Sequence, residues 1–221
     1  MNEETRMKEV KEFEELYQGI KRKGADKLLK FLRESDFYTA PASAKYHNSI
    51  PGGLLNHSLN VYRLLKKKFE TPGTLWYELQ KENEISEESF LIIGLLHDIC
   101  KTKFYETDYR NQKNYEPETV AEADPRDVKK DNKGSYIWES VPMYKVVDQL
   151  PYGHGEKSVV MIEAYMKLTW LERFAIRWHM AFSLPKEEWG VLSDAMREYP
   201  IILAVSEADL EATYILEKEN S

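Results

Sequence analysis

An adjacent histidine and aspartate follow an apolar run, residues 91–96, and are the side chains best placed to do chemistry. They are His97 and Asp98, and Lys101 comes one helical turn later. If a helix that starts near Glu87 ends at this pair, Lys101 lies on nearly the same face as both residues. Burial of an imidazole or carboxylate without a partner is costly, and a bound metal ion is one partner that offsets the cost. The pair therefore suggests a metal site whose other ligands come from elsewhere in the chain.

Histidines are scarce, and four of the five are predicted to lie at helix ends. They are His47, His57, His97, His154 and His179. A further carboxylate, Asp209, lies in an otherwise fairly apolar final helix. Imidazole and carboxylate ligands without thiolates suit Fe, Mn, Co, Ni, Zn or Mg in a catalytic centre. Taken one at a time, each histidine is also compatible with an ordinary core or surface position, and spacing alone does not show that they converge.

The elements that must position these residues are mainly helical. Helices are predicted over residues 1–35, 54–69, 75–82, 87–98, 155–167, 170–180, 186–199 and 201–216. Residues 102–150 differ, because segments 103–109 and 135–141 are rich in aromatic and β-branched residues and flank the polar stretch 117–134. A third strand is predicted at 143–147. The predicted fold class is mainly α, a helical bundle with an inserted small antiparallel β-hairpin or sheet. We expect a single domain over 1–221, with a helical extension at 1–24 and the β-rich insertion at 102–150.

Composition is that of an ordinary globular chain. Hydrophobic residues make up 42% and charged residues 31%, and the formal net charge is −7. An acidic balance argues against a broad surface that grips nucleic-acid phosphates, but it leaves an anionic substrate open because bound cations add local positive charge. We find no apolar run long enough to span a membrane and no secretory signal at the start of the sequence. With one cysteine, Cys100, the chain is expected to be cytoplasmic.

The order of these residues resembles that of the HD-domain metal-dependent phosphohydrolases. The resemblance covers roughly residues 25–217 and rests on the following segments: Gly52 to Ser58 (GGLLNHS), Leu95 to Lys101 (LLHDICK), Gly153 to Ser158 (GHGEKS), Ile176 to Met180 (IRWHM) and Glu207 to Asp209 (EAD). The motifs come in the family's order, separated by spacers that fit helices. One departure is Cys100, where the family usually has glycine before the signature lysine. The β-rich insertion is also longer than in minimal members, so substrate choice is expected to depend on it.

The resemblance implies a two-metal centre, of the subtype with the pattern H…HD…H…H…D. Its ligands would be His57, His97, Asp98 and Asp209 for the first divalent ion, and His154 and His179, with Asp98 bridging, for the second. The ion is expected to be Fe, Mn, Ni, Co, Zn or Mg. Two such ions activate a water for attack on phosphorus. Asp98 and Lys101 are therefore the predicted catalytic residues, and Lys101 is also expected to contact a phosphate oxygen.

The expected substrate is a small phosphorylated molecule, a phosphomonoester or phosphodiester of a nucleotide or short oligonucleotide. His47 is a further predicted substrate contact, with a plain loop residue as the alternative. Arg177 either holds a phosphate or forms a salt bridge on a helix surface. Other hypotheses are a 3′-5′ exoribonuclease-like activity, a nucleotide-sensing module without catalysis, and a di-iron oxygenase on the same scaffold. Short single-stranded nucleic acid as a ligand and a homo-oligomer stay open, and no membrane partner is expected.

Overall fold

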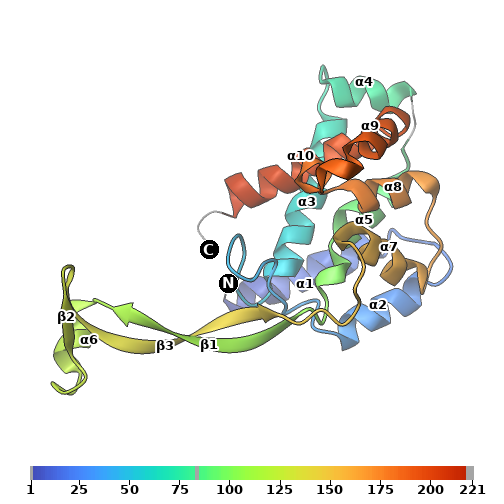
Figure 1. The fold of residues 1–221 in the computed structure, drawn as a ribbon. Helices are drawn as coiled ribbons and strands as arrows, with labels where there is room; N and C mark the ends of the chain where they lie inside the picture. The colour runs from blue at the N-terminus through green and yellow to red at the C-terminus, as the bar shows by residue number, and fades with distance from the viewer. Residues whose placement is uncertain (1, 83–84, 218–221) are drawn as a thin grey trace.

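A computed structural model describes residues 2–82 and 85–217, which form a helical bundle with a β-arm projecting from it (Figure 1). The first half of the bundle comprises α1 (Glu3–Tyr17), α2 (Ala25–Glu34), α3 (Gly53–Glu70), α4 (Leu75–Glu82) and α5 (Glu87–Leu96), with a 3-10 turn η1 (Ile99–Lys101) after α5. The second half comprises α7 (His154–Glu163), α8 (Trp170–Trp178), η2 (Ala181–Ser183), η3 (Lys186–Glu188), α9 (Trp189–Glu198), α10 (Ile201–Glu211) and a π-helical turn η4 (Ala212–Leu216). The predicted mainly α fold with an inserted antiparallel sheet is confirmed.

Helix α5 is buried in the bundle because it is apolar on every side. The Ser86 side chain caps its N-terminus by accepting a hydrogen bond from the backbone N–H of Ser89. Every residue from Ser89 to Leu96 is buried. A helix without a polar face belongs in a protein core, and α5 packs against α1, α3 and α8. The His97–Asp98 pair that follows α5 therefore emerges inside the protein rather than at its surface.

An ion cluster of Arg22, Glu88, Ser89 and Glu172 joins the first turns of α5 and α8. Arg22 Nη2 lies 3.0 Å from Glu88 Oε2 and 3.0 Å from Glu172 Oε1. Ser89 Oγ donates to Glu172 Oε1 at 2.8 Å. The fully buried Glu172 side chain also accepts from the backbone N–H of Thr169 in a capping box. These contacts satisfy a buried charge and fix where both helices begin.

The continuous helix predicted over residues 1–35 is wrong, because the chain breaks between α1 and α2. Gly24 at the start of α2 has φ +94°, and a Cβ there would lie 1.9 Å from the carbonyl oxygen of Tyr165. Only glycine adopts this left-handed conformation readily with the backbone so close. Met1, where the predicted N-terminal extension begins, lies outside the described residues, but α1 buries Phe13 and Tyr17 in the core of the bundle.

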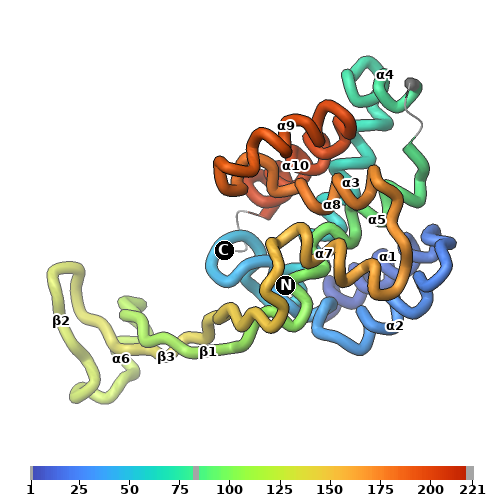
Figure 2. Tube along the Cα trace, turned by 45° about the vertical axis from the view of Figure 1, so that its right-hand side comes forward, coloured from blue at the N-terminus to red at the C-terminus, as the bar shows by residue number. Residues whose placement is uncertain are grey.

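The β-arm, residues 105–146, is built from β1 (Tyr105–Asn114), α6 (Pro117–Glu122), β2 (Lys129–Asp131) and β3 (Gly134–Val146). The strand order is β1-β3-β2, and β1 pairs with β3 from Tyr105↔Val146 to Asn114↔Ile137. Figures 1 and 2 show the arm extending away from the bundle, with β2 and α6 at its far end. Most of β1 is exposed, so the arm's attachment to the core lies at its base.

One prediction for the inserted region needs correction. The separate strand predicted at 143–147 is the end of the continuous strand β3, and the polar stretch 117–134 contains α6 and β2. Pro142 lies within β3, and because β2 pairs with β3 only between Gly134 and Tyr136, β3 has an open edge at the proline. Proline is tolerated at an open edge.

In the described parts of the chain, no helix has both the length and the apolarity needed to cross a bilayer.

Candidate metal centre

His57 and His97 come from two helices that pack closely together. His57 lies in the first turn of α3, and His97 follows the last residue of α5. Their Nε2 atoms are 3.4 Å apart, in the buried interior. Gly94 permits this approach, since a Cβ at its position would lie 2.6 Å from the Cα atom of Tyr62 on α3. Close packing of α3 on α5 thus brings together two histidines that are 40 residues apart in sequence.

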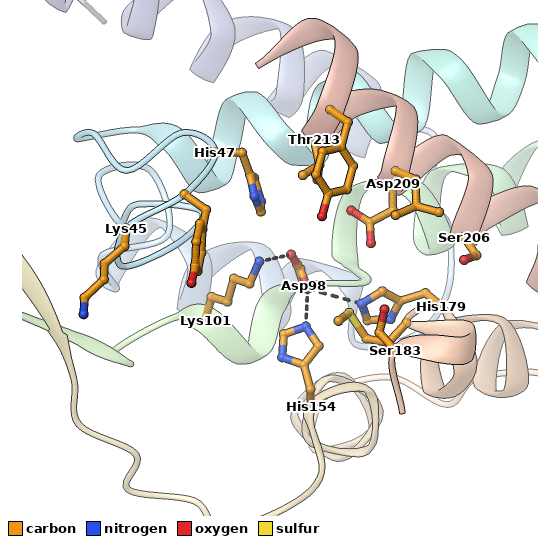
Figure 3. Close-up of a pocket in the computed structure, with 14 residues that line it drawn as sticks. Lys45, His47, Asp98, Lys101, His154, His179, Ser183, Ser206, Asp209 and Thr213 are labelled. Carbon is orange, nitrogen blue, oxygen red and sulfur yellow. Dashed lines mark hydrogen bonds and ion pairs between the residues drawn. The ribbon is translucent and has the colours of Figure 1, made fainter. Parts of the chain in front are cut away.

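Asp98 lies at the centre of the site, and its two oxygens face different partners (Figure 3). Oδ1 is 2.7 Å from His154 Nε2 and 3.5 Å from His179 Nε2. Oδ2 is 2.6 Å from Lys101 Nζ, 3.6 Å from His57 Nε2 and 3.7 Å from His97 Nε2. One carboxylate therefore joins the histidines of α7 and α8 to those of α3 and α5.

His154 and His179 meet because the start of α7 lies against the end of α8. His154 is the first residue of α7, His179 follows α8, and their ring centroids are 5.2 Å apart. A Cβ on Gly155 would lie 2.3 Å from the carbonyl oxygen of Arg177 and 2.7 Å from that of Ile176. Gly155 is thus a close-approach position that sets the separation of the two histidines.

Two carboxylates from the C-terminal helices flank His57. Asp209 on α10 places Oδ1 3.1 Å from His57 Nε2. Glu217, which follows the π-helical turn, has both carboxylate oxygens 3.1 Å from His57 Nδ1, and it accepts a hydrogen bond from Asn60. Glu217 is 1% exposed. Sequence reasoning missed Glu217, because it lies 160 residues from His57 in a segment of glutamate and lysine that has the composition of a solvated tail.

Hydrogen bonds to Nδ1 orient three of the histidine rings. His97 Nδ1 lies 3.0 Å from the carbonyl oxygen of Gly94, and His179 Nδ1 lies 2.8 Å from that of Ile176. A carbonyl oxygen only accepts, so both Nδ1 atoms carry the proton and donate it. Glu217 is the corresponding acceptor for His57. Each ring then turns Nε2 toward Asp98, which is the arrangement found when histidines ligate metals.

The electrostatics of the site favour a positive charge between the ligands. Burial would lower the pKa of His57, but Asp209 and Glu217 outweigh it and raise the pKa to about 10. Burial lowers the pKa of His97 to about 3, so this ring is neutral near pH 7. The pKa of Asp98 lies well below its usual range, because Lys101 and the histidines overcome the effect of burial. The carboxylates are therefore ionised, the His97 ring is neutral, and two carboxylates hold positive charge at His57, where a divalent cation would take the place of the Nε2 proton.

The residues present fit divalent metal ions. Three groups that meet here each bring their ligand atoms within 4.8 Å of one another: His57, His97 and Asp209; His97, Asp98 and His179; and Asp98, Cys100 and His154. His179 Nε2 is buried and has no hydrogen-bond partner among the described residues, as expected of an atom that ligates a cation. The structure thus brings all six predicted metal ligands into one site. Nitrogen and carboxylate donors suit the borderline and hard first-row ions named above.

Comparison with known proteins agrees with this site. The family model described as HD domain matches residues 54–213, which include all six of these residues. The chain belongs to the HD-domain family. Members of this family are generally metal-dependent hydrolases that bind divalent cations. No curated protein and no solved structure matches the chain.

The HD-domain site opens into a cavity of about 500 Å³ (Figure 3). Its lining residues come from the 41–52 loop, the ends of α5, α7 and α8, and the C-terminal helices: Lys45, Tyr46, His47, Asp98, Lys101, His154, His179, Met180, Ser183, Ser206, Asp209, Leu210, Thr213 and Tyr214. Lys101 lines the cavity, and its pKa is raised by Asp98 although burial opposes the charge. An ammonium group is therefore available at the wall of the cavity.

His47 lies in the same cavity, beside the predicted metal ligands. Its ring centroid is 5.0 Å from that of His57. Burial lowers the pKa of His47 to about 4, so the ring is neutral near pH 7. The structure places His47 where a substrate contact was predicted, facing the cavity from the loop that precedes α3.

Arg177 is not brought to the cavity. Its Nε lies 2.8 Å from Glu156 Oε1 and its Nη2 lies 2.7 Å from Glu188 Oε2. The guanidinium also lies over the ring of Trp178, 4.0 Å from the centroid. With its donors engaged by two carboxylates, Arg177 has the helix-surface salt bridges that were the alternative to a phosphate contact, and we leave it out of the site.

Cys100, the departure from the family's signature, lies behind His154. Its sulfur is 3.2 Å from His154 Nδ1 and the residue is buried. Burial raises the pKa of the thiol to about 12, so it stays protonated. A protonated thiol is a weak donor and a poor nucleophile. Cys100 therefore packs behind His154 and takes no reactive role.

Proposed function

We propose that this protein is a metal-dependent phosphohydrolase that cleaves a phosphomonoester or phosphodiester of a nucleotide or short oligonucleotide. The observation that carries the proposal is the placement of Asp98. Its Oδ1 faces the histidines of α7 and α8, and its Oδ2 faces those of α3 and α5. A carboxylate shared in this way suits two adjacent cations, the arrangement of two-metal hydrolases.

Residues of the chain would bind and orient the substrate around this centre. Divalent cations bound there would polarise a phosphoryl oxygen and lower the pKa of a water for attack on phosphorus. The Lys101 ammonium, 2.6 Å from Asp98 Oδ2, is close enough to the ligands to hold a phosphate oxygen beside them. His47, neutral and facing the cavity, can hold a substrate hydroxyl or phosphate through a hydrogen bond.

The cavity suits a nucleotide in size and lining. Its volume of about 500 Å³ falls in the range of small-molecule sites, roughly 300–1,000 Å³. The hydroxyls of Ser183, Ser206 and Thr213 line it and can donate to ribose or phosphate oxygens. Tyr46 and Tyr214 are exposed aromatic residues of the lining, and each offers a ring face on which a base can stack.

A substrate screen tests the proposal. Nucleoside mono-, di- and triphosphates, cyclic nucleotides and short RNA are incubated with the protein and Mn²⁺, and products are resolved by chromatography. We expect hydrolysis of at least one class. Binding without release of any product across the panel would instead favour a nucleotide sensor and would contradict the proposal. Metal analysis of protein purified without chelators should show one to two transition-metal equivalents.

Variants of the central pair connect any activity to the site. We expect Asp98→Ala and His97→Ala to lower hydrolysis to background while the helical circular dichroism is retained. Asp194→Ala is the matched control, because Asp194 is an exposed carboxylate on α9 whose side chain is 77% accessible. Wild-type hydrolysis by Asp98→Ala would place the reaction elsewhere.

A further inference from the structure

A groove separate in its lining from most of the metal cavity lies between the 41–52 loop and the base of the β-arm. Its volume is about 550 Å³. The loop contributes Ala44, Lys45, Ser49, Ile50 and Pro51, and the arm contributes Thr107, Arg110, Pro142, Met143 and Tyr144. The groove therefore exists only because the inserted arm leaves the bundle beside this loop.

Lys45 connects the groove to the metal cavity, because it lines both. In Figure 3 its side chain comes from the loop that carries His47 and points its ammonium away from Asp98. A ligand that enters the metal cavity at this side would thus pass Lys45 and continue into the groove. The groove is a continuation of the candidate active site and not a separate site.

Arg110 in the groove differs from most arginines of this protein. Seven of the nine arginines form ion pairs with carboxylates: Arg22, Arg33, Arg63, Arg126, Arg173, Arg177 and Arg197. Within the described residues, neither Arg110 nor Lys45 has a carboxylate within ion-pair distance, and the groove lining contains both cations and no acidic residue. In a chain of net charge −7, a wall with two uncompensated cations favours an anion.

We propose that the groove binds a second phosphate of the substrate, one nucleotide away from the phosphate that reacts. Arg110 and Lys45 hold the phosphate oxygens, since guanidinium and ammonium groups form charge-assisted hydrogen bonds with phosphate. The hydroxyls of Ser49, Thr107 and Tyr144 line the same groove and contact the adjoining sugar. This inference rests on the proposed function and narrows it, because it makes the substrate a nucleotide with a second phosphate.

Binding of three adenine nucleotides tests the inference without requiring turnover. Isothermal titration calorimetry on the full chain as purified compares AMP, adenosine 3′,5′-bisphosphate and the 5′-phosphorylated dinucleotide pApA. Each ligand is checked for integrity afterwards, and KM replaces Kd for any ligand that is hydrolysed. We expect the two ligands with a second phosphate to bind about tenfold more tightly than AMP, the gain typical of hydrogen bonds to a charged group. A gain for both shows that the second phosphate suffices, and a gain for pApA alone shows that the groove binds an oligonucleotide.

Arg110→Gln and Lys45→Gln should each remove most of the preference over AMP and weaken its dependence on salt. Arg126→Gln is the matched control, because Arg126 lies on the same arm, outside the groove, and pairs with Asp124. Equal affinity for all three ligands, or a preference that survives both variants, would overturn the groove proposal. Neither result would touch the proposed hydrolysis, which fails separately if the substrate screen shows no product.

Discussion

The bundle and the β-arm handle their ionisable residues in opposite ways. In the bundle, charges and imidazoles are buried and held by specific partners: His57, His97, Asp98 and His179 are at most 2% exposed. In the arm, most charges are exposed, and even large side chains such as Tyr109 and Trp138 are 65% and 49% accessible. The difference indicates that the two regions have different roles. The bundle fixes the geometry of the proposed chemistry, and the arm leaves its side chains free for recognition.

The largest expected difference lies between a buried and an exposed ion pair. Glu172→Ala in the bundle leaves Arg22 without its buried partner and removes the cap of α8. We expect it to lower the free energy of unfolding by about 3 kcal/mol or more, measured by urea denaturation. Asp124→Asn in the arm removes an exposed pair with Arg126 and should leave the melting temperature unchanged. Equal losses of stability in both variants would contradict the difference drawn between buried charges in the bundle and exposed charges in the arm.

Low pH should destabilise the protein by protonating the same buried carboxylate, that of Glu172. Burial alone would raise the pKa of Glu172, but Arg22 and the hydrogen bonds from Thr169 and Ser89 outweigh it and lower the pKa below the ordinary value of 4.5. The folded state then binds fewer protons than the unfolded chain. The stabilisation is fully present above pH 4.5 and is lost as the pH falls through the folded pKa. Unfolding free energies between pH 3 and 7 should fall less steeply for Glu172→Ala than for the wild type.

A single methyl group at the contact of α7 with α8 should disturb the metal centre without changing a ligand. In Gly155→Ala the new Cβ meets the carbonyl of Ile176, the group that orients His179. We expect a loss of about 1–3 kcal/mol in stability, together with a lower metal content in the purified protein. Gly190→Ala is the control, because a Cβ there contacts nothing within 4 Å. A normal metal content in Gly155→Ala would show that the helix separation does not control the site.

Glu217→Gln should weaken metal binding by about 10- to 100-fold, as is usual when the partner of a ligating histidine is changed. Its carboxylate holds Nδ1 of His57, and the amide replaces an ionic acceptor with a neutral one. Competition with a fluorescent chelator measures the affinity. Glu211→Gln, at a partly exposed carboxylate that pairs with Lys68, serves as the control. An unchanged affinity in Glu217→Gln would show that the negative charge of Glu217 does not support metal binding at His57.

Removal of most of the β-arm should have the smallest effect on the stability of the bundle. Thr107 and Tyr144 are register partners near the base of the arm, and an Asn-Gly turn can join them in place of residues 108–143. We expect the melting temperature of the bundle to stay within about 2 °C of the wild type, because on the order of 1 kcal/mol moves it by roughly 2–4 °C in a chain of this size. The preference for a second phosphate should disappear. A strongly destabilised bundle would show that the arm supports the fold.

Sequence alone was enough to predict which histidines and aspartates meet in one site, but not the parts of the chain that surround them. His57, the His97–Asp98 pair and Asp209 are recognisable because their motifs keep a fixed order between helices. The break after α1 depends on a tertiary contact at Gly24, which local propensity does not show. Glu217 reaches His57 across the fold, and the groove at Arg110 depends on how the arm leaves the bundle. Such long-range placements leave no periodic pattern in the chain.

The ion cluster at the start of α5 and α8 has a consequence for how this chain can change during evolution. Both helices begin at that cluster and end at the candidate metal centre, with His97 after one and His179 after the other. A one-residue insertion within either helix would turn its ligand by about 100° and move it about 1.5 Å along the axis. Length is therefore constrained in these two helices, whereas the tip of the arm is free to gain or lose residues. Homologues should differ in length between β1 and β3 and not between Glu88 and His97.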